Sequence, residues 1–573
     1  MLELKEVSLH AGSAPDAVAL LTDIGARFPK GHFSAILGPS GCGKSTLLKV
    51  IAGLREPSDG KVEWDGIDLA VEDMDPHEIG YVPQFSIAYD LLTVWENVDA
   101  AMQLRVSGLD AEAAEARVQK ILEDVGLDDI ADRRVALLSG GQKRRLALAL
   151  EMVSSPHLLL CDEATSGLDP KAEDEIVKLM HRLSRNDDRI VLSVTHSLRH
   201  LALYDSVLVL YQGHLAYHGA VDTLFHYFGV EQPDDLFPRL AMRPPEEWQR
   251  SWGKYRAAYY ATAQLDVVAP TPDEESETPE PAHRPAAAAT PSALKQFTVL
   301  LGRRWKLFFR DRAAVLLQIA LLIGFPCLVI IFALDGIPQI KTLATPLTGN
   351  FLDQMKSEFE QLSEMTKTGS LISGLVMFQI VLLALMGSNN SSREIAAERP
   401  IFEKEKFAGL RPGAYVASKT FFLAALVLAQ SLWMGLFVNT IVHFPGNLGP
   451  QLLVLVLVNA AVTAICLGIS SIMKSAEQAS LVGVYLVGFQ LPLSGAVLAL
   501  PEKLGWITRP FIASYWGWSG FISAMKDTRA YGAVGKVTQT ALSDVPVCIW
   551  VLAFHILIGL LVAYTGSKGS RWE

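Results

Sequence analysis

Six apolar stretches in the second half of the chain constrain its fold more than any other feature. An α-helix rises about 1.5 Å per residue and so needs about 20 apolar residues to cross about 30 Å of hydrocarbon. Buried core helices of a soluble protein are the alternative, but six such stretches in one chain are hard to explain that way. We therefore predict an all-α six-helix transmembrane domain over residues 313–573. The stretches cover residues 313–334, 370–388, 420–444, 451–473, 478–500 and 545–564, and none contains Asp, Glu, Lys or Arg.

The overall composition agrees with a membrane protein and excludes one class of partner. Of the 573 residues, 50% are hydrophobic and only 19% are charged, whereas soluble domains carry about 25% charge. The formal net charge is −11, so no basic excess is present to neutralise phosphates, and nucleic acid is not an expected partner. The five cysteines show no paired metal spacing, and neither a disulfide framework nor a zinc site is expected.

A glycine-rich loop in the first half fits the phosphate-binding pattern G-x-x-x-x-G-K-[ST]. It follows residues 33–37, which predict a strand, and precedes residues 44–52, which predict a helix. The glycines let backbone N–H groups point at phosphates, and the helix N-terminus adds positive potential. We expect Lys44 to reach the β- and γ-phosphates of ATP and Ser45 to bind Mg²⁺. The predicted ATP-binding residues of this loop are Gly38, Pro39, Ser40, Gly41, Cys42, Gly43, Lys44, Ser45 and Thr46.

Two adjacent carboxylates end a second apolar strand, predicted at residues 158–161. Asp162 stands at the strand's tip and is expected to hold the Mg²⁺ shell. Glu163 follows it and is placed to orient and deprotonate the attacking water. A strand that merely ends in solvated acids is the alternative, which the phosphate loop upstream disfavours.

A third motif supplies a further helix terminus for phosphate. The sequence Leu-Ser-Gly-Gly-Gln occupies residues 138–142 and includes Ser139, Gly140, Gly141 and Gln142. Residues 143–154 continue as a predicted helix. One nucleotide does not need two such sites from the same subunit. We therefore expect this loop to close on ATP held by another subunit.

These three motifs, in this order, resemble the ATPase domain of ABC transporters. The resemblance implies that Gln84 is the glutamine that contacts Mg²⁺ and the membrane domain, that Asp169 belongs to the D-loop, and that His196 is the switch histidine at the γ-phosphate. Glu163 and His196 are then the catalytic residues, and Ser45, Gln84 and Asp162 the Mg²⁺ site. The chain departs from the family upstream of the phosphate loop, where residues 8–18 offer no aromatic side chain for adenine and His10 is a weak substitute.

The order of the domains narrows the resemblance to the ABCG, or White-type, half-transporters. The resemblance implies a coupling loop at 389–419, with Glu394, Glu398 and Arg399 facing the ATPase domain, and an outer loop at 501–544. The fold class is thus an α/β P-loop ATPase domain fused to the six-helix domain. Its expected parts are the ATPase domain (1–264), a disordered Pro/Ala/Glu-rich linker (265–291) and an amphipathic connecting helix (292–312) with Leu294, Phe297, Leu301, Trp305 and Phe308 on its apolar face.

Function follows as an expectation from these parts. Because the chain has one phosphate loop and one signature loop, it needs a second half-transporter, most simply as a homodimer. The uncharged spans indicate a hydrophobic or amphipathic, lipid-like or drug-like substrate. The resemblance to ABCG-type half-transporters implies export across the plasma (cell inner) membrane. Membrane lipids would surround the spans, and the ATPase domain would lie in the cytoplasm. The alternative is an ATP-driven regulatory complex that translocates nothing. Candidate substrate-path residues are Gln379, Gln490, Leu491, Pro492 and His555; each could instead serve helix packing.

Overall fold

The computed structural model describes residues 1–12, 18–71, 74–85, 87–262, 265, 290–342, 351–496 and 500–569, with the side chains of residues 262, 341–342, 351–364 and 502 left out. Most of the predicted linker therefore lies outside the described residues. Contacts divide the chain into two units. The first holds Met1–Lys295 together with Lys404–Leu410, and the second holds Gln296–Glu403 and the chain from residue 411 onward.

The first unit is built on a mixed sheet. Within the described residues it has ten strands, in the order β5-β4-β1-β2-β10-β9-β3-β8-β7-β6. The β3, β8, β7 and β6 strands pair in parallel, whereas β1, β2, β4 and β5 form an antiparallel extension. The strands are β1 (Leu2–Ala11), β2 (Val18–Phe28), β3 (Phe33–Leu37), β4 (Asp59–Trp64), β5 (Ile67–Asp68), β6 (Ile79–Val82), β7 (Leu158–Asp162), β8 (Ile190–Val194), β9 (Ser206–Tyr211) and β10 (His214–Gly219).

Parallel pairing brings the predicted motifs to one edge of this sheet. All five residues of β3, of β7 and of β8 are buried, as near-continuous apolar runs in a covered parallel sheet should be. Because β7 and β3 both run parallel to β8, their carboxyl ends lie at the same edge. Ligands bind at this edge in open α/β sheets. The phosphate loop follows β3, the two carboxylates end or follow β7, and His196 follows β8.

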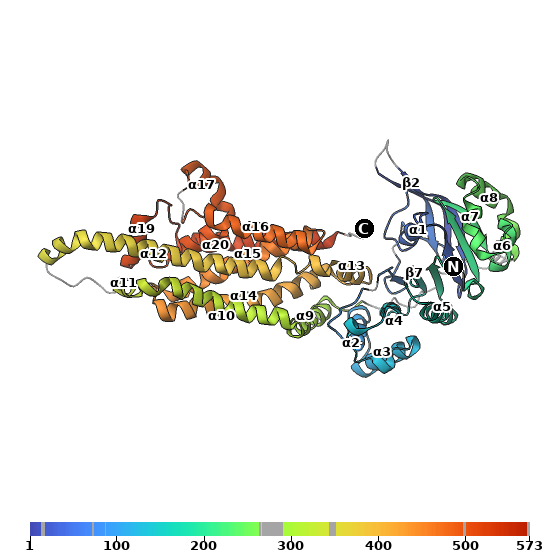
Figure 1. Cartoon of the computed structure of the whole chain (residues 1–573), viewed down its shortest axis with the longest axis horizontal. Helices are drawn as coiled ribbons and strands as arrows, with labels where there is room; N and C mark the ends of the chain where they lie inside the picture. Colours follow the sequence, from blue (N-terminus) through green and yellow to red (C-terminus); the bar gives the residue numbers. More distant parts are fainter. Residues whose placement is uncertain are drawn as a thin grey trace, which may run out of the picture. The chain divides into compact units, whose positions relative to one another are not determined.

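Helices complete the first unit. In Figure 1, α2 and α3 lie together away from the sheet, and α6, α7 and α8 lie near one another beside it. Tyr217 of β10 is fully buried, and its ring packs tilted against Trp252 and edge-on against Tyr259, both of α8. The helices are α1 (Lys44–Ile51), α2 (Val94–Arg105), α3 (Ala111–Val125), α4 (Gly140–Met152), α5 (Pro170–Arg185), α6 (Val221–Phe228), α7 (Leu236–Leu240) and α8 (Pro245–Thr262).

The second unit is helical, as the apolar stretches predict. Its long helices α10, α12, α14, α15 and α20 run alongside one another in Figure 1, with α17 and α19 near one end of the bundle and α9 near the other. The last residues of α13 group with the first unit. The helices are α9 (Ala293–Arg310), α10 (Arg312–Ala333), α11 (Ile337–Thr342), α12 (Phe351–Ser391), α13 (Arg399–Phe407), α14 (Pro412–Val442), α15 (Leu448–Ile472), α16 (Ala476–Leu493), α17 (Glu502–Thr508), α18 (Ala513–Ser523), α19 (Arg529–Val537) and α20 (Val545–Lys568).

Five helical segments among the described residues are long and apolar enough to cross a membrane: Arg312–Ile340, Met365–Phe407, Pro412–Val442, Leu448–Ile472 and Val545–Lys568. The predicted stretch at 478–500 is not one of them. Its helix, α16, starts with Glu477 and Gln478 in its first turn and ends at Leu493, directly after Pro492. Polar residues at both ends of this short helix reduce its apolar character, so the sixth span stays a prediction.

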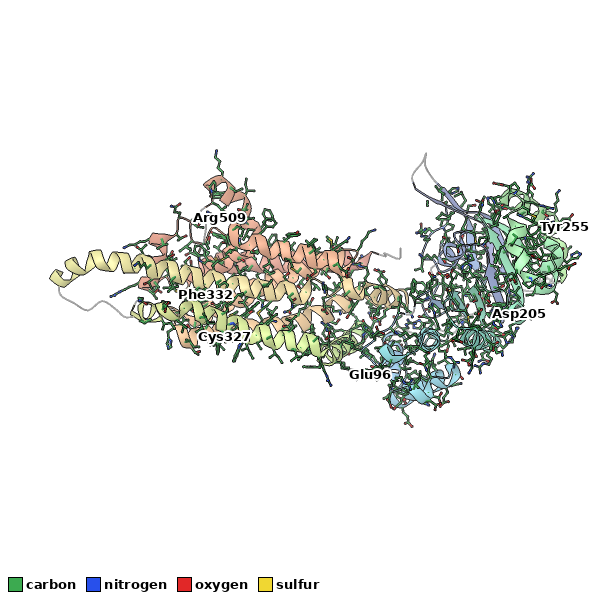
Figure 2. All side chains as sticks on the ribbon, viewed as in Figure 1. Glu96, Asp205, Tyr255, Cys327, Phe332 and Arg509 are labelled. Atoms are coloured by element: carbon green, nitrogen blue, oxygen red, sulfur yellow. The ribbon has the colours of Figure 1, made fainter. Side chains whose placement is uncertain are left out.

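The connecting segment is a helix, α9, and its buried residues are not those of the predicted apolar stripe. Gln296, Leu300, Arg303 and Leu307 are the buried residues, at helical spacing. The predicted apolar stripe lies beside them, and its first member, Leu294, is 72% exposed. In α10, which follows, only 11% of the apolar window is buried, and Phe332, labelled in Figure 2, is 61% exposed. The other stripe members are partly buried, and Trp305 and Phe308 pack against Phe422 of α14, so the placement of α9 at the membrane surface stays a prediction.

Candidate functional site

The phosphate loop is shaped by backbone conformations that favour glycine. Gly38 has φ 153°, and a Cβ there would lie 2.3 Å from the carbonyl O of Leu210. Gly43 is the N-cap of α1 with φ 104°, and no side chain caps this end. The first N–H groups of α1 are thus left for an anion. Lys44 is buried, and its Nζ donates to the carbonyl O atoms of Gly38 and Pro39, both at 2.9 Å.

Asp162 and Ser45 form the hard-oxygen donor pair that a magnesium site requires. Ser45 Oγ donates to Asp162 Oδ1 at 2.8 Å, and Tyr81 OH donates to Asp162 Oδ2 at 3.2 Å. Burial raises the pKa of Asp162 above its ordinary value, while the hydrogen bonds from Ser45 and Tyr81 oppose that rise. Hydroxyl and carboxylate oxygens beside a phosphate loop are donors that Mg²⁺ accepts. The residues present therefore fit the ion.

Glu163 is held between His196, the other predicted catalytic residue, and Gln84, a predicted Mg²⁺ ligand. Gln84 Nε2 donates to Glu163 Oε2 at 2.7 Å, and His196 Nε2 lies 2.7 Å from Glu163 Oε1. Glu163 also has φ 50°, a left-handed conformation that non-glycine residues rarely adopt and that clusters at active sites. A carboxylate fixed at both oxygens is oriented for a water on one side, the geometry of a general base. The structure thus brings Gln84, Glu163 and His196 together.

A cavity of about 430 Å³ lies over the phosphate loop. Besides loop residues and Glu163, it is lined by a short apolar run of β2 and by the β9–β10 turn. The motif analysis missed these positions, because no local pattern marks a strand that borders a distant loop. His10 pairs with Ala19 in the β1–β2 ladder and does not line the cavity. The missed lining residues are Val18, Ala19, Leu20, Gln212 and Gly213.

The signature loop forms the start of α4. Ser139 is its N-cap: Ser139 Oγ accepts from the N–H of Gln142 at 3.3 Å, and the Gln142 side chain accepts from the N–H of Ser139 at 2.9 Å. This reciprocal pair orients the helix start, including Gly140 and Gly141. None of these four residues, all of them described, lines the 430 Å³ cavity. Asp169 caps α5 by accepting from the N–H groups of Lys171 and Ala172.

Comparison with known proteins places both halves in one family. Residues 21–166 match the ABC transporter family, and residues 295–525 match the ABC-2 type transporter family. The methionine import ATP-binding protein MetN of Desulfitobacterium hafniense is 33% identical over 43% of this chain and 77% of that protein. The chain belongs to the ABC transporter family. Its first half is an ABC transporter ATPase domain, and its second half matches an ABC-2 type membrane domain whose apolar helices indicate an integral membrane protein.

Two further relatives show how far similarity extends. The ABC transporter ATP-binding/permease protein Rv1747 of Mycobacterium tuberculosis is 28% identical over 97% of this chain. The chain spans 61% of that relative's length. The dimeric structure of MJ0796, a bacterial ABC transporter cassette, is 29% identical, covers 39% of this chain and 99% of its own, and has a TM-score of 0.36.

The predicted coupling residues of this transporter make their contacts inside the second unit. Glu394 is buried and forms ion pairs with Arg304 and Lys419, and Lys419 also pairs with Glu398. The Arg399 guanidinium donates to the carbonyl O atoms of Ser470, Ser471 and Met473. These three residues lie at the C-terminal end of α15, where Met473 is the C-cap. A cation at a helix C-terminus is stabilised by the helix dipole. Their predicted contact with the ATPase domain stays a prediction.

A buried ion-pair cluster in the first unit was missed. Glu151 of α4 is 2% exposed; its Oε2 lies 3.1 Å from Arg105 Nη1 and its Oε1 lies 2.8 Å from Lys404 Nζ. Burial acts to raise the pKa of Glu151, but the Arg105 and Lys404 charges outweigh it and hold that pKa below its ordinary value. Lys404 belongs to α13, between predicted spans. The apolar run at residues 146–150, which ends directly before Glu151, was the available signal.

The candidate substrate-path residues with polar side chains are engaged in packing. Gln379 Nε2 donates to the carbonyl O of Met434, and Gln490 Oε1 accepts from the N–H of Ser514. His555 Nδ1 lies 2.8 Å from the carbonyl O of Val551, one turn earlier in α20. These contacts agree with the packing alternative for the three side chains. Leu491 is 39% exposed and Pro492 is also exposed.

Proposed function

We propose that two copies of this chain form an ABCG-type homodimer that exports a hydrophobic or amphipathic substrate, lipid-like or drug-like. The observation that carries the dimer is the incompleteness of the cavity over the phosphate loop. Ser139 to Gln142 form a capped helix start, yet in the described chain they do not line the cavity of their own subunit. A second copy would complete both sites by symmetry.

Hydrolysis at each site would use residues already held in place. When bound, ATP and Mg²⁺ supply the phosphoanhydride bond and the charge neutralisation for phosphoryl transfer. Ser45 and Asp162, with Gln84 nearby, would hold the ion, and Lys44 together with the start of α1 would bind the phosphates. Glu163 would accept the proton of the attacking water while His196 and Gln84 orient its carboxylate.

The interior of the membrane domain supports an apolar substrate. Three amides satisfy one another in a closed ring: Gln318 donates to Asn390 at 2.5 Å, Asn390 to Gln430 at 3.1 Å, and Gln430 to Gln318 at 2.8 Å. A separate cavity of about 230 Å³ between α14, α15 and α20 is lined by aliphatic residues and two threonines. Polar groups that pair with each other leave few partners for a charged solute.

Transport assays on sealed vesicles test this proposal. Purified full-length protein would be reconstituted into liposomes, with fluorescent phospholipid and hydrophobic dye panels as probes and external ATP acting on outward-facing ATPase domains. Export predicts ATP-dependent movement of a probe into the lumen, and no movement with Glu163→Gln. ATP hydrolysis that responds to a protein partner while no probe of either panel moves would contradict export and support a regulatory complex. Import of the same probes would contradict the direction.

A further inference from the structure

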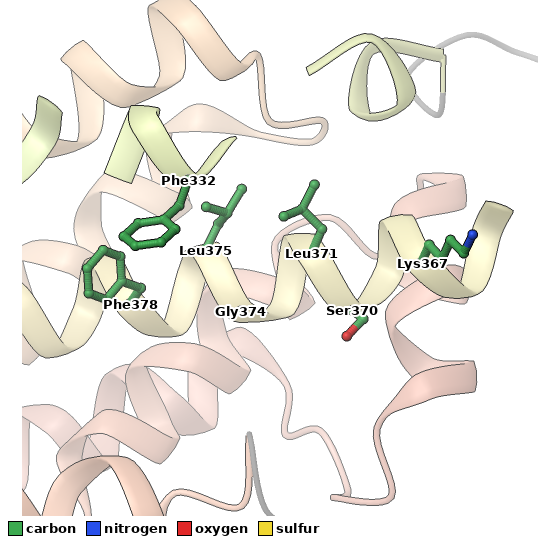
Figure 3. A pocket seen from close by; sticks show the side chains of 7 residues that line it. All are labelled: Phe332, Lys367, Ser370, Leu371, Gly374, Leu375 and Phe378. Carbon is green, nitrogen blue, oxygen red and sulfur yellow. The ribbon is translucent and has the colours of Figure 1, made fainter. Parts of the chain in front are cut away.

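A groove of about 620 Å³ between α10 and α12 lies apart from the ATP site and from the packed amides. One stripe of α12 lines it: Lys367, Leu371, Gly374 and Phe378 follow at intervals of four, three and four residues, which places them on one helix face. Phe332 of α10 closes the inner end against Phe378, with ring centroids 5.5 Å apart and nearly perpendicular planes. Figure 3 shows the two rings at one end of the stripe and Lys367 at the other.

Gly374 opens the middle of this groove. A Cβ built on Gly374 would meet no described atom within 4 Å, so the space next to this residue on α12 is open. Leu371 and Leu375 border the same stretch and give it apolar walls. The groove is therefore apolar along most of its length, with an ammonium group at one end. Its volume is that of an ordinary small-molecule site.

The depth of the groove can be measured along α12. Lys367 lies 24 residues before Ser391, where α12 ends (391 − 367), which is about 36 Å at 1.5 Å per residue. The charged cluster around Glu394, just after that end, suits the inner boundary of the bilayer. The hydrocarbon core is about 30 Å thick and the bilayer with its headgroups about 40–45 Å. Lys367 therefore falls in the outer headgroup layer, and Phe378, about 16 Å deeper, falls inside the outer leaflet.

We propose that this groove binds an anionic membrane lipid of the outer leaflet, with its phosphate at Lys367 and one acyl chain along Leu371 and Gly374 to the Phe332–Phe378 pair. Three features indicate a lipid as the occupant. Lys367 places one positive charge at headgroup depth, and the groove below it is apolar. Gly374 has no side chain at the point where the acyl chain would lie. Binding needs neither ATP nor a direction of transport, so this inference stands apart from the export proposal.

Photolabelling in nanodiscs tests the groove. Full-length protein in phosphatidylcholine discs would receive a trace of phosphatidylglycerol carrying a photoreactive acyl chain, or phosphatidylcholine with the same chain, and labelled peptides would be mapped. We expect peptides covering residues 371–378 to be labelled about twofold to fivefold more by the anionic lipid, the range of an exposed ion pair. Lys367→Gln should remove this preference and Lys367→Glu should reverse it.

Filling the groove provides the second arm. Gly374→Leu should lower labelling by both lipids at least about threefold, because its side chain enters space with no described neighbour. Gly324→Leu is the matched control: Gly324 lies on α10 outside the groove, also has no described neighbour within 4 Å, and should leave labelling unchanged. Equal labelling by both lipids in the wild type, or undiminished labelling in Gly374→Leu, would overturn the proposal. Loss of dimers in Gly374→Leu with unchanged labelling would assign the groove to a second copy instead.

Discussion

Replacing Glu151 by Gln should destabilise the ATPase domain strongly, because it leaves two buried cations without their anion. The side chains of Arg105 and Lys404 are 6% and 5% exposed, and each contacts a different oxygen of Glu151. Removing one partner of a buried ion pair costs about 3–5 kcal/mol. At about 1.4 kcal/mol per factor of ten, amide exchange in α4 should accelerate by roughly two to three and a half orders of magnitude.

Hydrogen exchange of the full-length protein measures this directly. Glu175→Gln is the matched control, since Glu175 also pairs with an arginine, Arg145, but is 42% exposed; a surface pair contributes at most about 1 kcal/mol. The double variant Glu151→Gln/Lys404→Met should recover part of the loss, because it removes one of the two unpaired buried cations, while Arg105 keeps its hydrogen bond to the carbonyl O of Leu150. If α4 exchanged at the wild-type rate in Glu151→Gln, the buried cluster would not stabilise the domain and the reasoning would be refuted.

Three further predictions follow from the same structure. Glu163→Gln should bind ATP yet hydrolyse it at less than about 1% of the wild-type rate, as loss of a general base costs about 10²–10⁴-fold; phosphate release checks this, and wild-type turnover would remove Glu163 from the role. Gly38→Ala should abolish nucleotide binding in a fluorescent-ATP titration, because its Cβ would collide with the carbonyl O of Leu210; unaltered affinity would show that the loop relaxes. The pKa of Glu151 is depressed in the folded chain, so the stability that this carboxylate contributes is present above about pH 4.3 and is lost as pH falls through the lower folded pKa. The difference in melting temperature between wild type and Glu151→Gln should therefore shrink below about pH 4.3. A difference that stays constant with pH would contradict a depressed pKa.

The nucleotide site could be predicted from sequence because its residues sit at strand ends in consecutive motifs. The predicted strand at 33–37 coincides with β3, and the one at 158–161 coincides with β7 except for its last residue. Parallel pairing then brings Ser45, Asp162 and Glu163 together without further information. The β2 wall of the cavity could not be found in this way, since it depends on how a distant strand pairs.

The membrane half was predictable in composition but less so in contacts. Apolar length alone locates five candidate spans, whereas α16 falls short because polar residues and Pro492 occupy its ends. Charge pattern alone could not tell that Glu394 would pair with Arg304, because that contact joins segments 90 residues apart. The buried face of α9 was displaced from the apolar stripe for a related reason: Gln296 is buried there and accepts from the N–H of Arg411.

The central claim is that one copy of this chain cannot hydrolyse ATP alone, since Ser139 to Gln142 must act on ATP held by a second copy. Nanodiscs sorted by single-molecule counting into those with one copy and those with two provide the measurement, with ATP turnover expressed per copy. We predict turnover only in discs that hold two copies, and its loss when one of the two carries Ser139→Arg together with Lys44→Ala. Equal turnover per copy in discs that hold a single chain would contradict the account.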